Sequence, residues 1–367
     1  MEARFVAKRS LRAVSMIRAA RLLLAVASIA ALLGCGSDGG GAPPPTTLRR
    51  LGLGADRLVG SAVDVAALNG DPEYRFLLAR EFNYVTAENA MKWGPIHPAE
   101  DTWNFGPADR VVNFARAHGM AVKGHALVWH EQLPDYVYAL PDAEALHAAL
   151  TEHISGVVSR YRGDIRAWDV VNEPIALSGA GLRRTVFLDL LGPDYIAEAL
   201  RLAHAADPHA LLYINEFGAE GLGAKSDTLY RLVEQLLQDG VPLDGVGFQM
   251  HLGYIFGAPP ATVRANLQRF ADLGLRVNIS EMDVQIGTLP LDEPSRLAVQ
   301  RQAYFDMVSA CAAVDACESI TFWGFTDKYS WIDRRFGYDD APLLFDDLYA
   351  KKPAYGGVAE ALRNARR

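Results

Sequence analysis

The stretch Trp168-Asp169-Val170-Val171-Asn172-Glu173-Pro174 decides the fold. It is a short apolar run that ends in a polar pair, and Pro174 cannot donate to a hydrogen-bonded ladder, so a strand is predicted to end there. A carboxylate at this point has two explanations. Glu173 either forms an ordinary ion pair at a strand end, or it lies at the mouth of a barrel, where strands deliver functional groups.

Apolar runs of the same kind recur along the chain and alternate with segments of helical apolar spacing. Eight runs favour strands, at 58–63, 84–87, 121–127, 165–171, 211–214, 245–250, 276–280 and 319–325. The segments between them favour helices, for example at 111–117, 143–161, 229–237 and 298–314. This alternation predicts a parallel sheet, either closed into a (β/α)8 barrel or open and doubly wound.

Residues at the strand ends distinguish the closed barrel from the open sheet. A barrel has its active site at the carboxyl ends of its strands, whereas a doubly wound sheet concentrates its site at one switch point. We therefore predict an α/β protein with a single (β/α)8 TIM-barrel catalytic domain over residues 48–367. Seven of the eight predicted strands end in polar or aromatic residues, namely Glu88, His125, Asn172-Glu173, Asn215-Glu216, Gln249 with His251, Glu281 with Asp283, and Trp323.

The first 47 residues are predicted to lie outside this fold. Basic residues that include Arg12, Arg18 and Arg21 precede an apolar run over 22–34, which is too short to span a bilayer but typical of a signal peptide. The run ends in Leu32-Leu33-Gly34-Cys35, which resembles the bacterial lipobox, in which the cysteine is lipidated. We predict a lipoprotein signal peptide over 1–34 and a Gly- and Pro-rich tether over 35–47.

The lipobox predicts an exported protein that is lipid-anchored to the cell envelope. Cys35 would be its one link to a membrane, and Gly36 directly after it favours the outer membrane. The alternative is a plain signal peptide with an incidental cysteine and a secreted product. Met16 is an alternative start of the chain.

Export also permits disulfides. Once Cys35 is lipidated, Cys311 and Cys317 are the cysteines that remain, and their separation of six residues suits a small loop after a helix. We predict a disulfide between them. The alternative is a pair of buried thiols.

Charge and missing motifs exclude several classes of function. The formal net charge of −8 argues against nucleic acid, whose phosphates attract basic patches. Gly52-Leu53-Gly54 is followed by Arg57 where a dinucleotide site needs glycine, and His130-Glu131 is followed by Pro134 where a zinc protease needs histidine. We expect a monomer with no metal, no cofactor and no nucleic-acid partner.

A second carboxylate lies in the same kind of place as the first. Glu281 follows the apolar start of Ile279-Ser280-Glu281-Met282-Asp283, on the strand predicted to lie across the barrel mouth from that of Glu173. Glycoside hydrolysis uses such a pair. In a retaining enzyme one carboxylate attacks the anomeric carbon, while the other protonates the leaving oxygen and then activates water. With tryptophans available to stack on sugars, the pair predicts a glycosidase.

Neighbouring residues receive supporting roles from their positions. Gln249 and His251 are expected to hydrogen-bond Glu281 and so to favour its ionised form. Asp283 is expected to orient His251. Asn172 is expected to bind the sugar 2-hydroxyl, an interaction that strengthens in the transition state.

These residues resemble glycoside hydrolase family 10, the xylanases built on (β/α)8 barrels. The resemblance extends from about Leu58 to Tyr355. The motifs that carry it stand in the family's order: VTAENAMKW (85–93), GHALVWH (124–130), WDVVNE (168–173), YINE (213–216), GFQMH (247–251), ISEMD (279–283), WGFTDKYSW (323–331) and PLLFD (342–346).

The resemblance implies endo-hydrolysis of the β-1,4-xylosidic linkages of xylan and xylo-oligosaccharides with retention, Glu173 being the acid/base and Glu281 the nucleophile. It also implies the disulfide of Cys311 and Cys317. Residues on the sugar one or two units to the non-reducing side would be Glu88, Asn89, Lys92 and Gln132. Residues around the sugar being cleaved would be His125, Trp129, Trp323 and Trp331.

Competing explanations exist for individual residues. Each tryptophan could instead pack in the core, and this explanation weighs most for Trp93 and Trp168. Lys92 could be a solvated charge, but it falls one helical turn after Glu88, which favours the site.

Three departures from the family pattern leave both carboxylates in place. Asn215-Glu216-Phe217-Gly218 stands where the family usually has Asn-Asp-Tyr-Asn, Tyr136 stands where tryptophan is common, and segment 333–341 is longer than the usual loop. Two rival functions remain. One is a β-1,4-glucan hydrolase, for which the bulk at Gln132, Trp323 and Trp331 would have to admit a hydroxymethyl group. The other is a surface lipoprotein that binds xylan without cleaving it.

Overall fold

The structure, a computed structural model, describes residues 46–253 and 257–365. The chain divides into two units, Met1–Pro45 and Thr46–Arg367, and the described helices and strands belong to the second. The predicted signal peptide, the lipidation of Cys35 and nearly all of the tether therefore lie outside the described residues. Of the helices in the described ranges, none has the length and apolar character needed to cross a bilayer.

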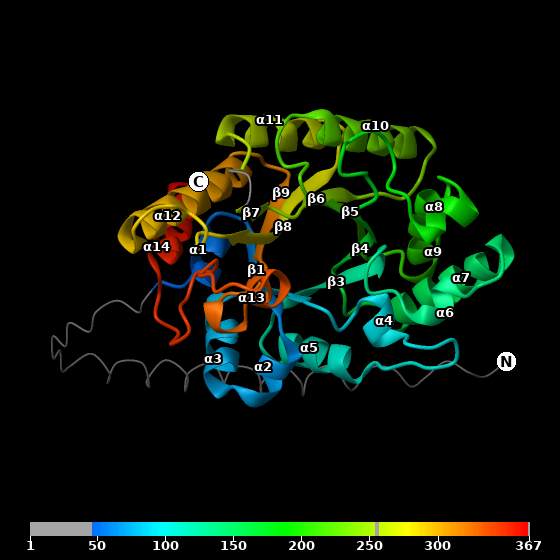
Figure 1. The fold of residues 1–367 in the computed structure, drawn as a ribbon, viewed down its shortest axis with the longest axis horizontal. Helices are drawn as coiled ribbons and strands as arrows, with labels where there is room; N and C mark the ends of the chain where they lie inside the picture. The colour runs from blue at the N-terminus through cyan, green and yellow to red at the C-terminus, as the bar shows by residue number, and fades with distance from the viewer. Residues whose placement is uncertain (1–45, 254–256, 366–367) are drawn as a thin grey trace, which may run out of the picture. The chain divides into compact units, whose positions relative to one another are not determined.

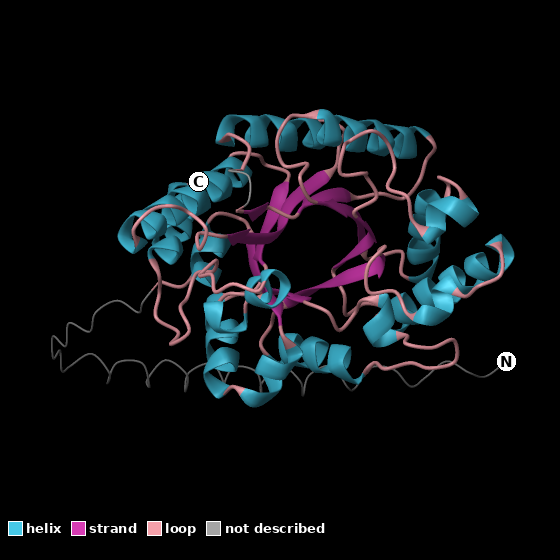
Figure 2. Ribbon diagram, in the orientation of Figure 1, coloured by secondary structure: helices cyan, strands magenta, loops and turns pink. Residues whose placement is uncertain are grey.

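Eight parallel strands close into a barrel, as predicted. Neighbouring strands pair in chain order, β6 pairs with β8, and β9 returns to pair with β1, so the ring has no free edge. Figure 2 shows the ring of strands with the helices outside it. The strands of the ring are β1 (Leu58–Val63), β2 (Tyr84–Ala87), β3 (Ala121–Val128), β4 (Ala167–Asn172), β5 (Leu211–Glu216), β6 (Gly245–Phe248), β8 (Arg276–Val284) and β9 (Cys317–Phe322).

Helices connect the strands and cover the barrel from outside (Figure 1). Many begin where the sequence supplies a capping side chain, for example Asp142 before α7 and Asp292 before α12. The helices are α1 (Leu48–Gly54), α2 (Val65–Gly70), α3 (Pro72–Glu81), α4 (Trp93–Ile96), α5 (Gly106–Ala117), α6 (Asp135–Tyr138), α7 (Ala143–Arg160), α8 (Val186–Leu191), α9 (Tyr195–Ala206), α10 (Ala224–Gln238), α11 (Pro260–Ala271), α12 (Glu293–Ala312), η1 (Asp327–Tyr329), α13 (Trp331–Phe336) and α14 (Pro353–Asn364).

All eight predicted strands are present, but one boundary error bears on the site. The strand predicted over 276–280 continues to Val284, so Glu281 and Asp283 lie inside β8 and not after it. Pairing with β9 continues as far as Met282, and β7 (His251–Leu252), a two-residue strand, pairs with Asp283 and Val284 and extends the ladder. The pairing sets His251 directly opposite Asp283.

The tryptophans suspected of core packing are in the core. Trp168 is fully buried, and its ring lies so close to Gly124 of β3 that a Cβ there would be 2.1 Å from it. Trp93 is buried and stacks on His153 of α7, with 4.0 Å between ring centroids. Both rings hold elements together beneath the barrel mouth and are not available to a ligand.

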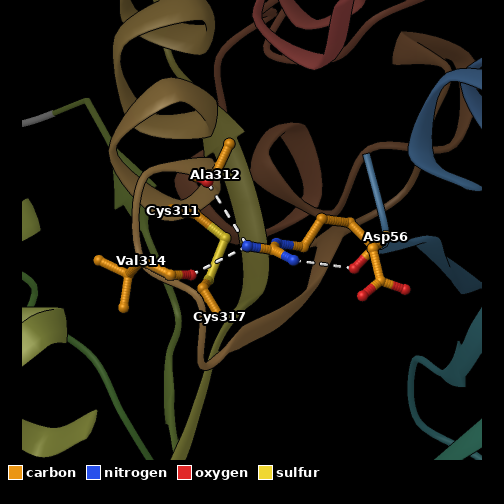
Figure 3. Close-up of a disulfide and its surroundings, with 6 residues drawn as sticks. Asp56, Cys311, Ala312, Val314 and Cys317 are labelled. Atoms are coloured by element: carbon orange, nitrogen blue, oxygen red, sulfur yellow. Dashed lines mark hydrogen bonds between the residues drawn. A yellow bond between two sulfur atoms is a disulfide. The ribbon is translucent and has the colours of Figure 1, made fainter. Parts of the chain in front are cut away.

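The predicted disulfide between Cys311 and Cys317 is present, which excludes the pair of free thiols. It closes the turn that leads from α12 into β9 (Figure 3). Arg57, just before β1, donates to the carbonyl oxygens of Ala312 and Val314 in the same turn, at 3.5 and 3.0 Å. The bond and the guanidinium thus fix the entry to β9 against β1.

Replacing both cysteines with serine is expected to lower the free energy of unfolding without lowering activity at 25 °C. A cross-link over a loop this short contributes about 2 kcal/mol, mainly by restricting the unfolded chain. Urea unfolding of the wild type, the double variant and the wild type kept reduced would measure the difference. Equal midpoints for all three would contradict a stabilising role.

Candidate active site

Glu173 is the first residue after β4 and has a left-handed backbone, with φ of 56°. Such a conformation is unfavourable for a residue with a side chain and persists only where the surroundings enforce it. Here the Glu173 amide donates to the Asn215 carbonyl oxygen at 2.8 Å, and Arg183 Nε donates to the Glu173 carbonyl oxygen at 2.9 Å. Strand β5 and the loop after β4 therefore hold the backbone that aims this carboxylate, which is 9% exposed.

The Glu173 carboxylate is surrounded by donors. Oε1 accepts from Gln249 Nε2 at 3.1 Å and from Asn172 Nδ2 at 3.3 Å. Arg183 and His130 approach Oε2, at 3.8 and 3.9 Å. The expectation that Gln249 hydrogen-bonds Glu281 is wrong, because its amide is used on Glu173 and Asn172.

Glu281 lies within β8 and is 4% exposed. Asn215 Nδ2 donates to its Oε1 at 2.6 Å, and His251 Nε2 lies 3.3 Å from its Oε2. The other ring nitrogen of His251 lies 2.8 Å from Asp283 Oδ2, which also accepts from Trp331 Nε1 at 2.8 Å. Asp283 therefore orients His251 against Glu281, as predicted.

The two ring nitrogens of His251 both face carboxylates, so both are satisfied as donors when the ring is protonated. Burial alone would lower the pKa of His251, but Asp283 and Glu281 outweigh it and raise that pKa. Burial alone would raise the pKa of Glu281, but His125, His251 and Lys92 outweigh it and lower that pKa. The site thus keeps Glu281 ionised, which a nucleophile requires.

A chain of charged groups supports the site from inside the barrel. His125 Nδ1 lies 2.9 Å from Asp169 Oδ2, and Asp169 Oδ1 pairs with Lys123 Nζ at 2.7 Å. All three side chains are almost fully buried. Asp169 fixes the orientation of the ring through Nδ1, and the same nitrogen lies 3.9 Å from Glu281 Oε1.

A second group of polar residues surrounds Asn89. Asn89 donates to Glu88 Oε1 at 3.2 Å, and its own side-chain oxygen accepts from Lys92 at 3.0 Å and from Gln132 at 3.2 Å. The helical turn expected between Glu88 and Lys92 is absent, since these residues form a bend and turn before α4. Lys92 is nonetheless buried and not solvated, which supports its assignment to the site.

Three tryptophans complete the arrangement. Lys92 Nζ lies 4.7 Å from the ring centroid of Trp129 and 5.8 Å from that of Trp323. Trp323 packs edge-on against His125, and Trp331 lies 5.1 Å from His251, between ring centroids. The predicted site residues therefore meet in one continuous set of contacts at the carboxyl ends of the strands.

Two residues without a predicted role are central to the site. Asn215 donates to both Asn172 and Glu281, and Ser280 Oγ donates to its side-chain oxygen at 2.6 Å, which fixes the amide's direction. The place of Asn215 at the end of a predicted strand was a signal from which a role in the site could have been predicted. Arg183 comes from a loop after β4 that shows no periodic pattern, so nothing in the sequence marks it. Among the residues in the described ranges, no three His, Cys, Asp or Glu side chains gather as a metal site.

Known proteins resemble this chain over nearly the whole barrel. It matches the model of glycosyl hydrolase family 10 over residues 48–361. It is 43% identical to an endo-1,4-beta-xylanase of Agaricus bisporus over 82% of this chain and 90% of that protein. It is 40% identical to endo-1,4-beta-xylanase B of Thermotoga neapolitana, over 90% and 95% of the two chains. Xylanase 10B of Thermotoga petrophila RKU-1, solved with xylobiose, has a TM-score of 0.85 at 40% identity, over 89% of this chain and 100% of that one.

Proposed function

The chain belongs to glycosyl hydrolase family 10 and is an endo-1,4-β-xylanase, and we propose that it cleaves xylan by a retaining double displacement. In this proposal Glu281 is the nucleophile and Glu173 is the acid/base. The observation that carries it is the environment of Glu281, because His251, Asn215 and Lys92 all favour the charged form of this carboxylate.

In the first step the ionised Glu281 attacks the anomeric carbon, and Glu173 donates a proton to the departing glycosidic oxygen. The bond from carbon to that oxygen breaks as the bond to Glu281 forms. Asn215 and His251 hold Glu281 in place throughout, which limits its freedom before attack.

In the second step Glu173, now a carboxylate, removes a proton from water, and the resulting hydroxide displaces Glu281 from the sugar. Asn172 and Gln249 both donate to Glu173 Oε1, so they orient the carboxylate that acts at this stage. Two inversions at one carbon give a product with the starting β-configuration.

The residues around Asn89 and the three tryptophans suit a neutral sugar chain. Indole faces stack on sugar C–H groups, and a sugar's hydroxyls need convergent donors and acceptors such as Glu88, Asn89 and Gln132. The rival β-1,4-glucan would add a hydroxymethyl group to each unit. We propose that the indoles of Trp323 and Trp331 leave little room for it.

We also propose that the protein is exported and lipid-anchored at Cys35, with catalysis confined to residues 48–367 and a monomeric chain. The sequence Leu32-Leu33-Gly34-Cys35 after an apolar run supports this. Radiolabelled palmitate incorporation in the bacterium, lost in Cys35→Ser, would test it. Label that persists in the variant would contradict an anchor at this cysteine.

Product analysis tests the proposed activity most directly. Purified residues Thr46–Arg367, which keep the Thr47 cap of α1, would be offered unbranched xylan and carboxymethylcellulose in parallel, with anomeric configuration followed by proton NMR. We expect early β-anomeric xylo-oligosaccharides from xylan alone. Cleavage of the glucan would overturn the substrate, α-anomers would overturn retention, and binding without cleavage would favour the binding lipoprotein.

Replacing His251 with alanine is expected to move the acid limb of the kcat/KM profile to higher pH. His251 helps to depress the pKa of Glu281, so the wild type keeps its nucleophile ionised until the pH falls through that low value. Without His251, Glu281 becomes protonated and kcat/KM falls at higher pH, although His125 and Lys92 still lower its pKa. Superimposable acid limbs for the two proteins would contradict this role.

A further inference from the structure

Helix α13 (Trp331–Phe336) leads into segment 333–341, which is longer than the family pattern, and it lies near β1 (Figure 1). Its first residue, Trp331, donates to Asp283 beside the nucleophile. One turn later, Arg334 reaches Glu88 Oε1 at 3.2 Å and Asp64 Oδ2 at 3.5 Å. The helix thus connects the supports of Glu281 with the carboxylate proposed to bind the neighbouring sugar.

Arg334 separates two carboxylates that would otherwise repel each other. Asp64 precedes α2 and caps it, while Glu88 directly follows β2. Burial raises the pKa of Glu88, and the charge of Asp64 raises it further. The strongest opposing influence is Arg334, followed by Lys92 and the hydrogen bond from Asn89. The phenol of Tyr74 on α3 also feels Glu88, but burial raises its own pKa, so it stays neutral.

The hydrogen bonds to Glu88 are made to one of its two carboxylate oxygens. Within the described part of the chain, Arg334 and Asn89 both reach Oε1, and no donor reaches Oε2. Glu88 is only 6% exposed, so a polar oxygen here needs a partner when the site is filled. A sugar hydroxyl donates more strongly to an ionised carboxylate than to a neutral acid, and Oε2 must be turned toward it.

We propose that Arg334 is a positioning residue for substrate binding, which holds Glu88 as an oriented carboxylate with Oε2 available to a sugar hydroxyl. The inference rests on the proposed sugar-binding role of Glu88 and extends it to a residue of the longer segment. Arg334 touches neither Glu173 nor Glu281, so it acts on binding of the sugar units to the non-reducing side and leaves bond cleavage alone. Its removal therefore changes KM and not kcat.

The test compares Arg334→Ala with Arg335→Ala in residues Thr46–Arg367. Arg335 is a matched control, since it stands next in the same helix and its side chain is 59% exposed against 58% for Arg334. Among the described residues its ion pair is with the exposed Glu131. For xylotetraose at pH 6 we expect Arg334→Ala to raise KM roughly three- to tenfold, the effect of one ordinary hydrogen bond, with kcat unchanged. Arg335→Ala should change neither.

The pH dependence gives a readout that a merely structural role would not move. As pH falls, protonation of Glu88 should raise KM, and this rise should begin at higher pH in Arg334→Ala than in the wild type. Arg334→Lys keeps a positive charge and should restore part of the difference. The inference would be overturned if Arg334→Ala left KM unchanged or lowered it, or if KM depended on pH in the same way in the variant and the wild type. Equal effects of Arg334→Ala and Arg335→Ala would also overturn it, because they would show that only the net positive charge matters.

Glu88→Gln separates failure of the inference from failure of the proposed function. If Glu88→Gln leaves KM for xylotetraose unchanged, the sugar-binding role of Glu88 fails. If Glu88→Gln raises KM but Arg334→Ala does not, only the role of Arg334 fails. If Arg334 acts through Glu88, adding Arg334→Ala to Glu88→Gln should produce no further change.

Discussion

Glu281→Ala is expected to abolish hydrolysis of xylan, with kcat reduced by about 10⁴-fold or more, the order seen when a covalent nucleophile is removed. No neighbouring group can take over the attack. Asn215 and His251 are donors that serve Glu281, and Asp283 is occupied by His251 and Trp331. Initial rates on xylan, with an active-site titration to exclude contaminating enzyme, would measure the loss.

Folding of the variant needs a separate measurement, because Glu281 is buried. Alanine removes one acceptor from Asn215 and one from His251, although Asn172 and Asp283 remain, and each lost partner costs about 1–3 kcal/mol. That loss stays below the roughly 5–15 kcal/mol by which domains are stable, so a folded, less stable protein is expected. A cooperative thermal transition and retained xylan binding would show that Glu281→Ala is folded. Near-normal turnover would mean that another residue is the nucleophile.

The closed barrel was predictable because its signals are local and repeated. Short apolar runs such as the one ending at Glu173 give strands, and functional residues at nearly every strand end favour closure over an open sheet. The pairing of β9 with β1 then follows from geometry and needs no special residue. By the same logic the two carboxylates were predictable, since each follows an apolar run.

The site's details were less predictable where the backbone departs from regular geometry. Gln249 and His251 are two residues apart, and in a continuous strand they would point to the same side, toward one carboxylate. Met250 between them is left-handed, with φ of 66°, and breaks the alternation. Gln249 therefore serves Glu173 while His251 serves Glu281.

The helical turn predicted from the spacing of Glu88 and Lys92 was wrong for a related reason. Four residues separate Glu88 from Lys92, which suits a helix, yet the segment is a bend and turn. The side chain of Asn89 binds the side chains of Glu88, Lys92 and Gln132, so these residues meet without a helix. Asparagine favours turns over the interior of a helix, so its position in the motif was a more reliable signal than the spacing of Glu88 and Lys92.

Glu173→Ala should reduce cleavage of xylan by about 10²–10⁴-fold, the usual contribution of a positioned acid or base, but should spare the first step on aryl xylobiosides with good leaving groups. A nitrophenolate departs without a proton, so only the second step, in which water must be activated, remains slow. Kinetics on dinitrophenyl xylobioside should therefore show a burst of phenolate followed by a slow steady state.

The same variant distinguishes an acid from a merely structural residue. Arg183 and Asn172 still hold the backbone and the surrounding network after Glu173 is truncated, so substrate binding should survive. A small anion such as azide needs no base to attack the glycosyl enzyme, and it should accelerate the second step and give a β-configured xylobiosyl azide. Equal losses on xylan and on the aryl substrate, with no effect of azide, would remove Glu173 from the acid/base role. Restoration by azide would show that the slow second step lacks a base, because azide attacks without one. Together with the fast first step on a good leaving group, it would assign both proton transfers to Glu173.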